Sequence, residues 1–361
     1  MSRQTRLKIS FCTVCMNRMY HLRQTLPENI KANIIYGNVE FIILDYNSTD
    51  GLADWIKTDM AHHIASGILK FYKTEEPQQF HRSHSRNMAF RLGDGDILCN
   101  VDADNYLGEG FAQFINETFT QHDNIYLTPN YGIRDVIGRL AIKKADFFHF
   151  RGYNEEMEEY GFEDIELYRR LMNNRRLQIQ FADKSYTQVI YHSNAERISN
   201  EYIGKNCLHV LIRYLDNKNS MLTFLYKDGT YEAGTYVDTS ESTPCQVSQN
   251  IFDNMVSLTG AMQTGRWFYT DRSLCIEHNG DKARKFRIVE NQNTRYYYRP
   301  GEKQYEVTDK QFKTDLMLLK TEVYNRRKLS ELLKTPYAGV NKNGFGQGKV
   351  IKNFLSVTYL D

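Results

Sequence analysis

Ile97-Leu98-Cys99-Asn100-Val101 is followed directly by Asp102-Ala103-Asp104-Asn105. The first five residues form a short, nearly continuous apolar run, which is typical of a strand covered by helices on both faces of a sheet. The next four residues include two carboxylates one residue apart. We therefore predict a buried strand over 97–101 whose carboxyl end carries an acidic turn.

The residues that precede this strand alternate between strand-like and helix-like segments. We predict further strands over 7–14, 40–44 and 68–72, and helices over 21–33, 52–64 and 83–92. This rhythm predicts an α/β fold with a mostly parallel sheet and helices on both of its faces.

The pattern changes after about Asp216. Apolar segments flank the turn pairs Asp228-Gly229, Asn279-Gly280 and Pro300-Gly301, which favours antiparallel hairpins. Helical periodicity returns over 312–333, before a glycine-rich turn and a short apolar strand. We predict an α/β domain over 1–215, a smaller β-hairpin-rich region over 216–308, and a C-terminal helix with its tail over 309–361.

Composition limits the classes of partner. The 46 basic and 44 acidic residues give a net charge of +2, so no overall field attracts the chain to nucleic acid or to an anionic membrane. The amino terminus runs into the first strand without a long apolar segment, which predicts a soluble chain with no transmembrane segment. Nothing in the sequence specifies an oligomeric state.

The six cysteines are spread over the chain, which favours reduced thiols and a cytoplasmic location over a disulfide framework. Cys12 and Cys15 have a C-x-x-C spacing, but no second pair follows, and a strand would turn them to opposite faces. We interpret both as core residues. The six are Cys12, Cys15, Cys99, Cys207, Cys245 and Cys275.

The acidic turn after the predicted strand 97–101 has two interpretations. In an open parallel sheet, ligands bind beyond the carboxyl ends of the strands. There, Asp102 and Asp104 lie close enough to contact one hard divalent cation, which in turn bridges phosphate oxygens. Aspartate also favours turns and helix caps without any ligand. The D-x-D spacing alone leaves both interpretations open.

Other strand ends carry polar motifs in a fixed order. They comprise Asn17-Arg18 with Leu22 and Thr25-Leu26, Asp45-x-Asn47-Ser48-Thr49-Asp50-Gly51, Arg86-Asn87 before Gly93-Asp94-Gly95-Asp96-Ile97, Asp102-Ala103-Asp104-Asn105, Gly152-Tyr153-Asn154-Glu155 and Tyr160-Gly161-Phe162-Glu163-Asp164. The ordered set is more specific than any one of its members. By this set the chain, from about Ser10 to His192, resembles the family 2 glycosyltransferases of the GT-A fold, especially bacterial polysaccharide polymerases and the galactosyltransferase-like branch.

The resemblance implies a role for each matching residue in a transfer from a nucleotide-sugar donor, a UDP-sugar, to a hydroxyl acceptor with inversion. On the donor side, Asp45 would accept a hydrogen bond from the base, uracil, and Arg86 would support the diphosphate or orient Asp102. Asn17, Arg18 and Asn47 would complete the donor side. On the acceptor side, Asp164 would remove the proton of the incoming hydroxyl, and Glu163 would hold the acceptor. Glu163 and Asp164 also suit the first turn of a helix whatever the function.

The resemblance also implies a metal site. Asp102 would meet the ribose or the metal, Asp104 would ligate it, and His192, after a strand predicted over 187–191, would complete its shell. Carboxylates with an imidazole favour Mn²⁺ over Mg²⁺. A hydrogen-bonded histidine at a strand end is the alternative. We interpret His81, His84 and the His62-His63 pair as loop and helix-surface residues.

The sequence departs from the family pattern at two places, of which the first concerns the backbone path before Asn17 and the second concerns the acceptor pocket. Cys15-Met16 replaces the proline that commonly precedes Asn-Arg, and Tyr160-Gly161-Phe162 replaces the usual Trp-Gly-Gly. The acceptor's identity is therefore not carried over from the family, and we expect a glycan or glycoconjugate. The run Arg295-Tyr296-Tyr297-Tyr298-Arg299 leaves modified nucleic acid as a less favoured acceptor.

Three further interpretations remain. A nucleotidyltransferase, or a non-catalytic nucleotide-sugar-binding protein, is the alternative on the same fold. The run from Glu155 to Glu159 lacks the spacing of a calcium loop, so we predict a solvated segment. The glycines at 344, 346 and 348 do not open a helix after a strand, so we predict a mobile turn and not a phosphate loop.

Overall fold

The computed structural model describes residues 6–129, 135–173, 177–238, 256–292, 294–332 and 339–361. The chain divides into two compact units. The first unit contains residues 1–158, 162–192 and 332–361, and the second contains 159–161 and 193–331. These bounds differ from the predicted segments 1–215, 216–308 and 309–361, because the end of the chain returns to the first unit. Cys245 lies outside the described residues.

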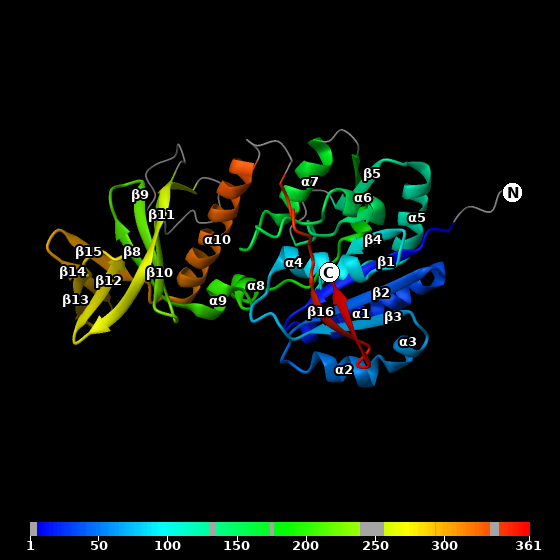
Figure 1. Ribbon diagram of the computed structural model, residues 1–361, viewed down its shortest axis with the longest axis horizontal. Helices are drawn as coiled ribbons and strands as arrows, with labels where there is room; N and C mark the ends of the chain where they lie inside the picture. Colours follow the sequence, from blue (N-terminus) through cyan, green and yellow to red (C-terminus); the bar gives the residue numbers. More distant parts are fainter. Residues whose placement is uncertain (1–5, 130–134, 174–176, 239–255, 293, 333–338) are drawn as a thin grey trace. The chain divides into compact units, whose positions relative to one another are not determined.

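A nine-stranded sheet runs through the first unit in the order β17-β16-β3-β2-β1-β4-β6-β5-β7. Its central strands β3, β2, β1 and β4 lie side by side in Figure 1. The four central strands, from β3 to β4, are mutually parallel, as predicted. Both flanks add antiparallel pairs that the sequence did not indicate, β4 with β6 and β3 with β16. The bounds are β1 (Ile9–Cys15), β2 (Val39–Tyr46), β3 (Leu69–Thr74), β4 (Ile97–Asn100), β5 (Ile125–Pro129), β6 (Ala141–Lys143), β7 (Gln178–Ala182), β16 (Gly348–Lys352) and β17 (Ser356–Leu360).

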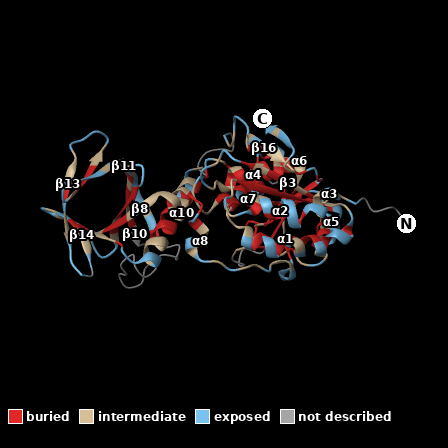
Figure 2. Cartoon of the chain, turned by 90° about the horizontal axis from the view of Figure 1, so that it is seen from below, coloured by how far each residue is buried: buried red, intermediate tan, exposed pale blue. Residues whose placement is uncertain are grey.

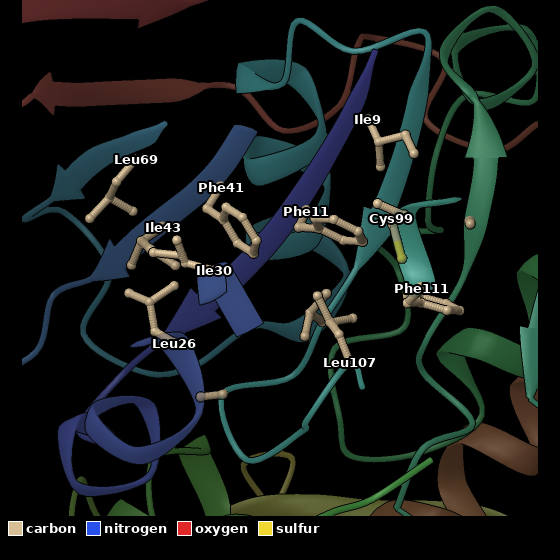
Figure 3. Packing of buried hydrophobic residues seen from close by; sticks show 14 of the residues in the cluster. Ile9, Phe11, Leu26, Ile30, Phe41, Ile43, Leu69, Cys99, Leu107 and Phe111 are labelled. Atoms are coloured by element: carbon tan, nitrogen blue, oxygen red, sulfur yellow. The ribbon is translucent and has the colours of Figure 1, made fainter. Parts of the chain in front are cut away.

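Two buried clusters lie on opposite faces of this sheet, because successive strand residues point to opposite sides. On one face Phe11, Phe41 and Ile43 pack against Leu26 and Ile30 of the first helix (Figure 3). The helices of this unit are α1 (Met19–Asn33), η1 (Ile34–Tyr36), α2 (Leu52–Asp59), α3 (Ala61–Ala65), α4 (Arg82–Leu92), α5 (Phe111–Gln121), α6 (Lys144–His149), α7 (Glu163–Asn173) and η2 (Lys184–Tyr186).

The second cluster lies across the sheet from the first. It joins Cys12, Ile42 and Leu44 to Met88 of α4 and Leu167 of α7, and both clusters form the buried centre of the unit (Figure 2). Helices therefore cover both faces, which confirms the predicted α/β architecture. Cys12 belongs to this cluster and Cys15 to the other, so the C-x-x-C pair is divided between the two cores. All five described cysteines are free thiols.

Two sequence predictions for this unit are wrong. The helix predicted over 52–64 is interrupted at Met60, which ends α2 and precedes α3. The strand predicted over 187–191 forms only an isolated bridge, Val189 with Asn105. β7 already occupies the sheet edge beside β5, so residues 187–191 run along the acidic turn instead, where Ile190 N donates to Asp104 O (2.8 Å).

The second unit contains eight antiparallel strands that close into a barrel, in the order β10-β11-β12-β13-β14-β15-β8-β9. This confirms the predicted β-rich region with its hairpins and its helix. The strands are β8 (Cys207–Tyr214), β9 (Asn219–Tyr226), β10 (Thr230–Asp238), β11 (Val256–Thr270), β12 (Ser273–His278), β13 (Arg284–Glu290), β14 (Arg295–Arg299) and β15 (Glu302–Glu306), and the helices are α8 (Asn194–Ile198), α9 (Tyr202–Asn206) and α10 (Lys310–Leu332).

The two faces of the barrel wall bury different residues. Leu211, Leu225 and Phe286, from strands all around the barrel, share one cluster, which is the barrel interior. Val210 and Ile212, which alternate with Leu211, pack outside against α10. No helix among the described residues is long and apolar enough to cross a membrane.

Candidate active site

The loops after β1 and β2 are tied to each other. Asn17 Oδ1 accepts a hydrogen bond from Thr49 N (2.8 Å), and Asn17 N donates to Ser48 Oγ (3.0 Å). Asn17 and Asn47 both have left-handed backbones, with φ of 53° and 63°, a conformation that asparagine tolerates better than most residues. Arg18 lies directly before α1, and Asn47 Nδ2 donates to Pro77 O (2.8 Å). These predicted donor-side residues therefore also shape the loops.

Asp45 lies at the carboxyl end of β2 and is fully buried. Its Oδ1 accepts from Ser48 N (2.7 Å), whereas its Oδ2 has no hydrogen-bond partner in the part of the chain that the structure describes. Burial raises the pKa of Asp45 to about 6. A buried acceptor without a donor is costly, so this oxygen suits an N–H or O–H group supplied by a ligand.

Arg86 on α4 joins three carboxylates. Its Nη1 donates to Asp164 Oδ1 (2.8 Å) and Glu163 Oε1 (3.1 Å), and its Nη2 donates to Asp102 Oδ1 (3.1 Å). Arg86 is buried with 6% of its surface exposed, and its guanidinium lies over the ring of Tyr153. The structure thus brings together Asp102 from the end of β4 and the Glu163–Asp164 pair from the start of α7, which are about sixty residues apart in sequence.

The charges in this cluster change the acidity of its members. Burial alone would raise the pKa of Asp102, but the Arg86 guanidinium holds it below its usual range. Burial raises the pKa of Asp164 to about 7, and the charges of Glu163 and Asp102 add to this effect against that of Arg86. Asp164 is therefore a carboxyl group that gains and loses its proton near neutral pH, as a general base requires.

Asp104 and His192 form a second pair. Asp104 Oδ2 lies 2.8 Å from His192 Nε2, and Asp104 Oδ1 accepts from Asn105 Nδ2 (2.8 Å). Asp102 does not join them, because its Oδ1 is bonded to Arg86 and Asn100. No group of three or more His, Cys, Asp or Glu residues among the described positions could hold a metal ion. A carboxylate oxygen and an imidazole nitrogen are both ligand types that divalent transition metals accept, so Asp104 and His192 could supply two ligands to such an ion.

The first helix holds the acidic turn through a row of polar side chains, which sequence reasoning missed apart from Thr25. Thr25 Oγ1 donates to Ala103 O (2.7 Å), and Asn29 Nδ2 donates to Asn105 O (2.9 Å). Asn33, one turn further along, donates to Gly108 O (3.2 Å). The spacing of four residues places all three on one face of α1. A buried polar row on an otherwise apolar helix face was the available signal.

A buried arginine, Arg139, also holds the acidic turn in place. Arg139 has 1% of its surface exposed, and its Nη2 donates to Asn105 Oδ1 (2.9 Å). Asn105 in turn donates to Asp104, so Arg139 orients a predicted metal ligand through one intermediate side chain. Burial lowers the pKa of Arg139 to about 10, which leaves the guanidinium charged at neutral pH. No sequence motif marked this residue.

Sequence reasoning also assigned no role to Gly138. A Cβ atom at this position would lie 2.7 Å from Arg86 Nη2, 3.1 Å from Asp102 Oδ2 and 3.3 Å from Asp164 Oδ2. Its carbonyl accepts from Asn100 Nδ2 (2.8 Å). Only a residue without a side chain fits beside the Arg86 cluster without displacing it. Nothing in the sequence indicated this, because Gly138 lies in a segment without a recognisable motif.

The glycine-rich turn near the end of the chain packs against α4 and Glu155. This contact contradicts the predictions that the turn is mobile and that Glu155 is solvated. Glu155 Oε1 accepts from Asn87 Nδ2 (2.8 Å) and from Gly346 N (2.6 Å), so Glu155 is not simply solvated. Gly346 lies so close to α4 that a Cβ atom there would be 2.7 Å from Met88 N. The glycine-rich turn is therefore docked. His81 caps α4 by accepting from His84 N (3.3 Å).

The profile of Glycosyl transferase family 2 matches residues 10–191, which covers every strand-end residue described above except His192. A search of curated proteins gives no significant match.

Among solved structures, Staphylococcus aureus TarS 1–349 is 16% identical, with 54% of this chain and 66% of that chain covered and a TM-score of 0.42. The mannosyltransferase PcManGT from Pyrobaculum calidifontis, in complex with GDP-Man and Mn²⁺, is 15% identical, with 55% and 64% covered and a TM-score of 0.44. A point mutant of Drosophila β1,4-galactosyltransferase 7, with manganese, UDP-Gal and xylobiose, is 16% identical, with 53% and 73% covered and a TM-score of 0.36.

The chain thus spans slightly less than two thirds of the first two of these structures. The assignment to the family rests on the profile match over residues 10–191 and on the α/β sheet, because the ends of its strands carry the motifs of the family. This chain belongs to glycosyl transferase family 2 and has the GT-A fold.

Proposed function

We propose that this protein transfers a sugar from a nucleotide-sugar donor, a UDP-sugar, to a hydroxyl group of a glycan or glycoconjugate, with inversion and with a divalent metal ion. One observation carries the proposal. Arg86 links Asp102, from the acidic turn predicted to meet the donor, to Glu163 and Asp164, which are predicted to meet the acceptor. A site for group transfer needs both halves at one place.

On the donor side, Asp45 Oδ2, which has no hydrogen-bond partner among the residues described, is the acceptor that we assign to the N–H group of the uracil base. Asn17, Arg18 and Asn47 shape the loops around it. Asp104, His192 and Asp102 would hold Mn²⁺, or Mg²⁺ as the alternative. The ion would offset the negative charge that develops on the departing diphosphate.

On the acceptor side, Asp164 takes the proton from the attacking hydroxyl, and Glu163 binds the acceptor sugar. Glu163 Oε2 supports this assignment, because it is buried with no hydrogen-bond partner among the described residues. As the hydroxyl oxygen bonds to the anomeric carbon, the bond to the diphosphate breaks on the opposite face, and the proton moves to Asp164. A base in this position contributes about 10²- to 10⁴-fold in rate.

A glycan acceptor is favoured over modified nucleic acid by the pairing in β14. Tyr297 is fully buried and pairs with the buried Gln304, whereas Tyr298 is exposed. Strand alternation then puts Arg295 and Arg299 on the face of Tyr297, and Tyr296 on the face of Tyr298. The two rings that reach solvent, Tyr296 and Tyr298, are therefore on the opposite face from the arginines of this run and do not form one mixed surface with them for a nucleic-acid strand.

The direct test is a panel of nucleotide sugars with Mn²⁺, with release of the nucleoside diphosphate as the measurement. We expect one UDP-sugar to be turned over, and Asp104→Ala to abolish the Mn²⁺-dependent release while the protein remains folded. Asp123→Ala is the matched control, because the Asp123 side chain is 93% exposed and precedes β5, at the opposite end of the strands from the acidic turn. Full activity of Asp104→Ala would remove the metal assignment. Pyrophosphate release from a nucleoside triphosphate would instead indicate nucleotidyl transfer.

A further inference from the structure

The interior of the barrel carries charged side chains as well as its apolar cluster. Tyr297 and Leu211 belong to the interior cluster, and residues paired across neighbouring strands share a face. Gln304 pairs with Tyr297, so Gln304 and, two residues before it, Glu302 face inward. Arg299 pairs with Glu302, and Arg213 lies two residues after Leu211. Small barrels normally fill this space with apolar side chains, so inward charges need an explanation.

Three arginines converge on the single carboxylate of Glu302. Arg213 Nη1 lies 3.0 Å from Glu302 Oε1, and Arg284 Nη1 lies 3.8 Å from the same oxygen. Arg299 Nε lies 3.9 Å from Glu302 Oε2. The Glu302 side chain is 10% exposed, whereas the three arginine side chains are 30–37% exposed. The Glu302 side chain is therefore enclosed, and the arginine side chains around it are partly exposed to solvent.

The charges of this cluster do not balance. Three guanidinium groups face one carboxylate, and no other ion pair joins Arg213, Arg284 or Arg299 to an acidic residue within the described ranges. Of the three arginines, only Arg213 is at hydrogen-bond distance from Glu302, because 3.8 and 3.9 Å are too long. Gln304 Nε2 also donates to Glu302 Oε1 (3.2 Å). Arg299 is held in place by the ring of Phe286, 5.8 Å from its guanidinium carbon. Among the residues that the structure describes, two of these positive charges therefore have no matching anion.

We propose that Arg213, Arg284 and Arg299 form a binding site for an oxyanion that is carried on a saccharide. The oxyanion is either a phosphate group or a carboxylate group. Guanidinium groups bind both of these planar or tetrahedral anions through paired N–H donors. Glu302 holds the arginines together while neutralising only one of them. The site gives the second unit a binding role of its own, and it does not depend on the transfer reaction proposed for the first unit.

The proposal is tested by isothermal titration calorimetry on the full chain, with four probes: inorganic phosphate, glucose 6-phosphate, glucuronate and glucose. We expect glucose 6-phosphate or glucuronate to bind, glucose not to bind, and the affinity to fall as salt is added. Tighter binding of glucose 6-phosphate would identify phosphate as the recognised group, and tighter binding of glucuronate would identify carboxylate. Binding of inorganic phosphate as tightly as glucose 6-phosphate would identify a free-phosphate site and overturn the saccharide part of the proposal.

Two double variants with the same loss of charge separate this site from a general charge effect. Arg284→Gln with Arg299→Gln is expected to weaken binding by at least about tenfold. Lys285→Gln with Arg287→Gln, on the same strand but exposed on the outer face, is expected to leave it unchanged. Equal weakening by both double variants would overturn the proposal, as would the absence of binding to any anionic probe.

A third variant changes binding in the opposite direction and does not depend on the first pair remaining folded. Glu302→Gln removes the internal anion that competes for the three arginines, so we expect anion binding to become at least about threefold tighter. If the cluster were only a structural ion-pair network, Glu302→Gln would lower the melting temperature without any gain in anion affinity. That result would also overturn the proposal.

Discussion

Arg86 Nη1 donates to Asp164 Oδ1 at 2.8 Å, while Nη2 of the same guanidinium donates to Asp102 Oδ1 at 3.1 Å. One buried side chain of α4 therefore fixes the distance between the end of β4 and the start of α7. The geometry of the proposed site depends on the length and the planar fork of this arginine.

Two substitutions of Arg86 separate the effect of its positive charge from the effect of its planar geometry. We expect Arg86→Lys to keep the protein folded but to reduce turnover by about 100-fold, because a single ammonium group cannot hold three carboxylates in place. Arg86→Leu should cost about 3–5 kcal/mol of unfolding free energy, since it leaves buried carboxylates unpaired. Chemical denaturation and nucleotide release measure the two effects. Wild-type activity in Arg86→Lys would show that the arrangement is not needed.

Asp164 predicts a pH dependence. Its pKa is raised to about 7, so the carboxyl group is protonated below that pH and becomes an available base above it. We expect kcat/KM to rise with pH through about 7. Asp164→Asn should lose about 10²- to 10⁴-fold in transfer and lose this pH step, while donor binding is retained. An unchanged pH profile in Asp164→Asn would assign the step to another group.

Gly138 predicts a steric effect. A methyl group there would lie 2.7 Å from Arg86 Nη2 and would displace the guanidinium. We expect Gly138→Ala to lower turnover by about 100-fold and also to lower the melting temperature, because the displaced guanidinium no longer pairs fully with its three carboxylates. Gly339→Ala is the control, because the nearest atom to its Cβ would be Lys342 Cε at an ordinary 3.4 Å. Equal turnover in the two variants would contradict this prediction.

Lys320 predicts a stability effect in the second unit. It is 3% exposed, and its Nζ lies 2.5 Å from Glu159 Oε1 and 2.9 Å from Glu232 Oε2. Lys320→Met should cost about 3–5 kcal/mol, because two carboxylates lose their shared cation. Adding Glu159→Gln and Glu232→Gln should restore most of that loss, as measured by denaturant unfolding. If the triple variant were no more stable than Lys320→Met, the charges would not be the cause.

Glu40 predicts an acid-dependent stability. Burial alone would raise its pKa, but Lys70, Ser10 and Lys8 lower the pKa from 4.5 to about 2. The stabilisation is complete above pH 4.5 and is lost as the pH falls towards 2, by about 2–3 kcal/mol in total. Glu40→Gln should remove this part of the pH dependence of unfolding. Identical acid unfolding curves for the variant and the wild type would refute the assignment.

The sequence was informative where a structure is set by local pattern. The strand segment from Phe41 to Leu44 is apolar without interruption because both faces of the sheet are covered, and Asp228-Gly229 marks a hairpin because glycine tolerates the turn. The strand predicted over 187–191 failed because periodicity does not reveal which edge of a sheet is already occupied.

The site was less predictable than the sheet. Asp102 and Asp164 carry recognisable motifs, but the contact of both with Arg86 depends on how α4 and α7 pack. Gly138 and Arg139 lie in a segment with no motif, and their roles come from distances to residues far away in sequence. Local propensity contains no information about such distances.

The return of residues 348–360 to the sheet has a consequence for the order of synthesis. β16 pairs with β3, and β17 pairs with β16, so the first unit lacks two edge strands until the whole barrel region has been made. During translation, the edge of β3 would be open to other chains while the second unit emerges from the ribosome. A slow ribosome or a truncated transcript would expose that edge for longer, and aggregation of the nascent protein would be its visible sign.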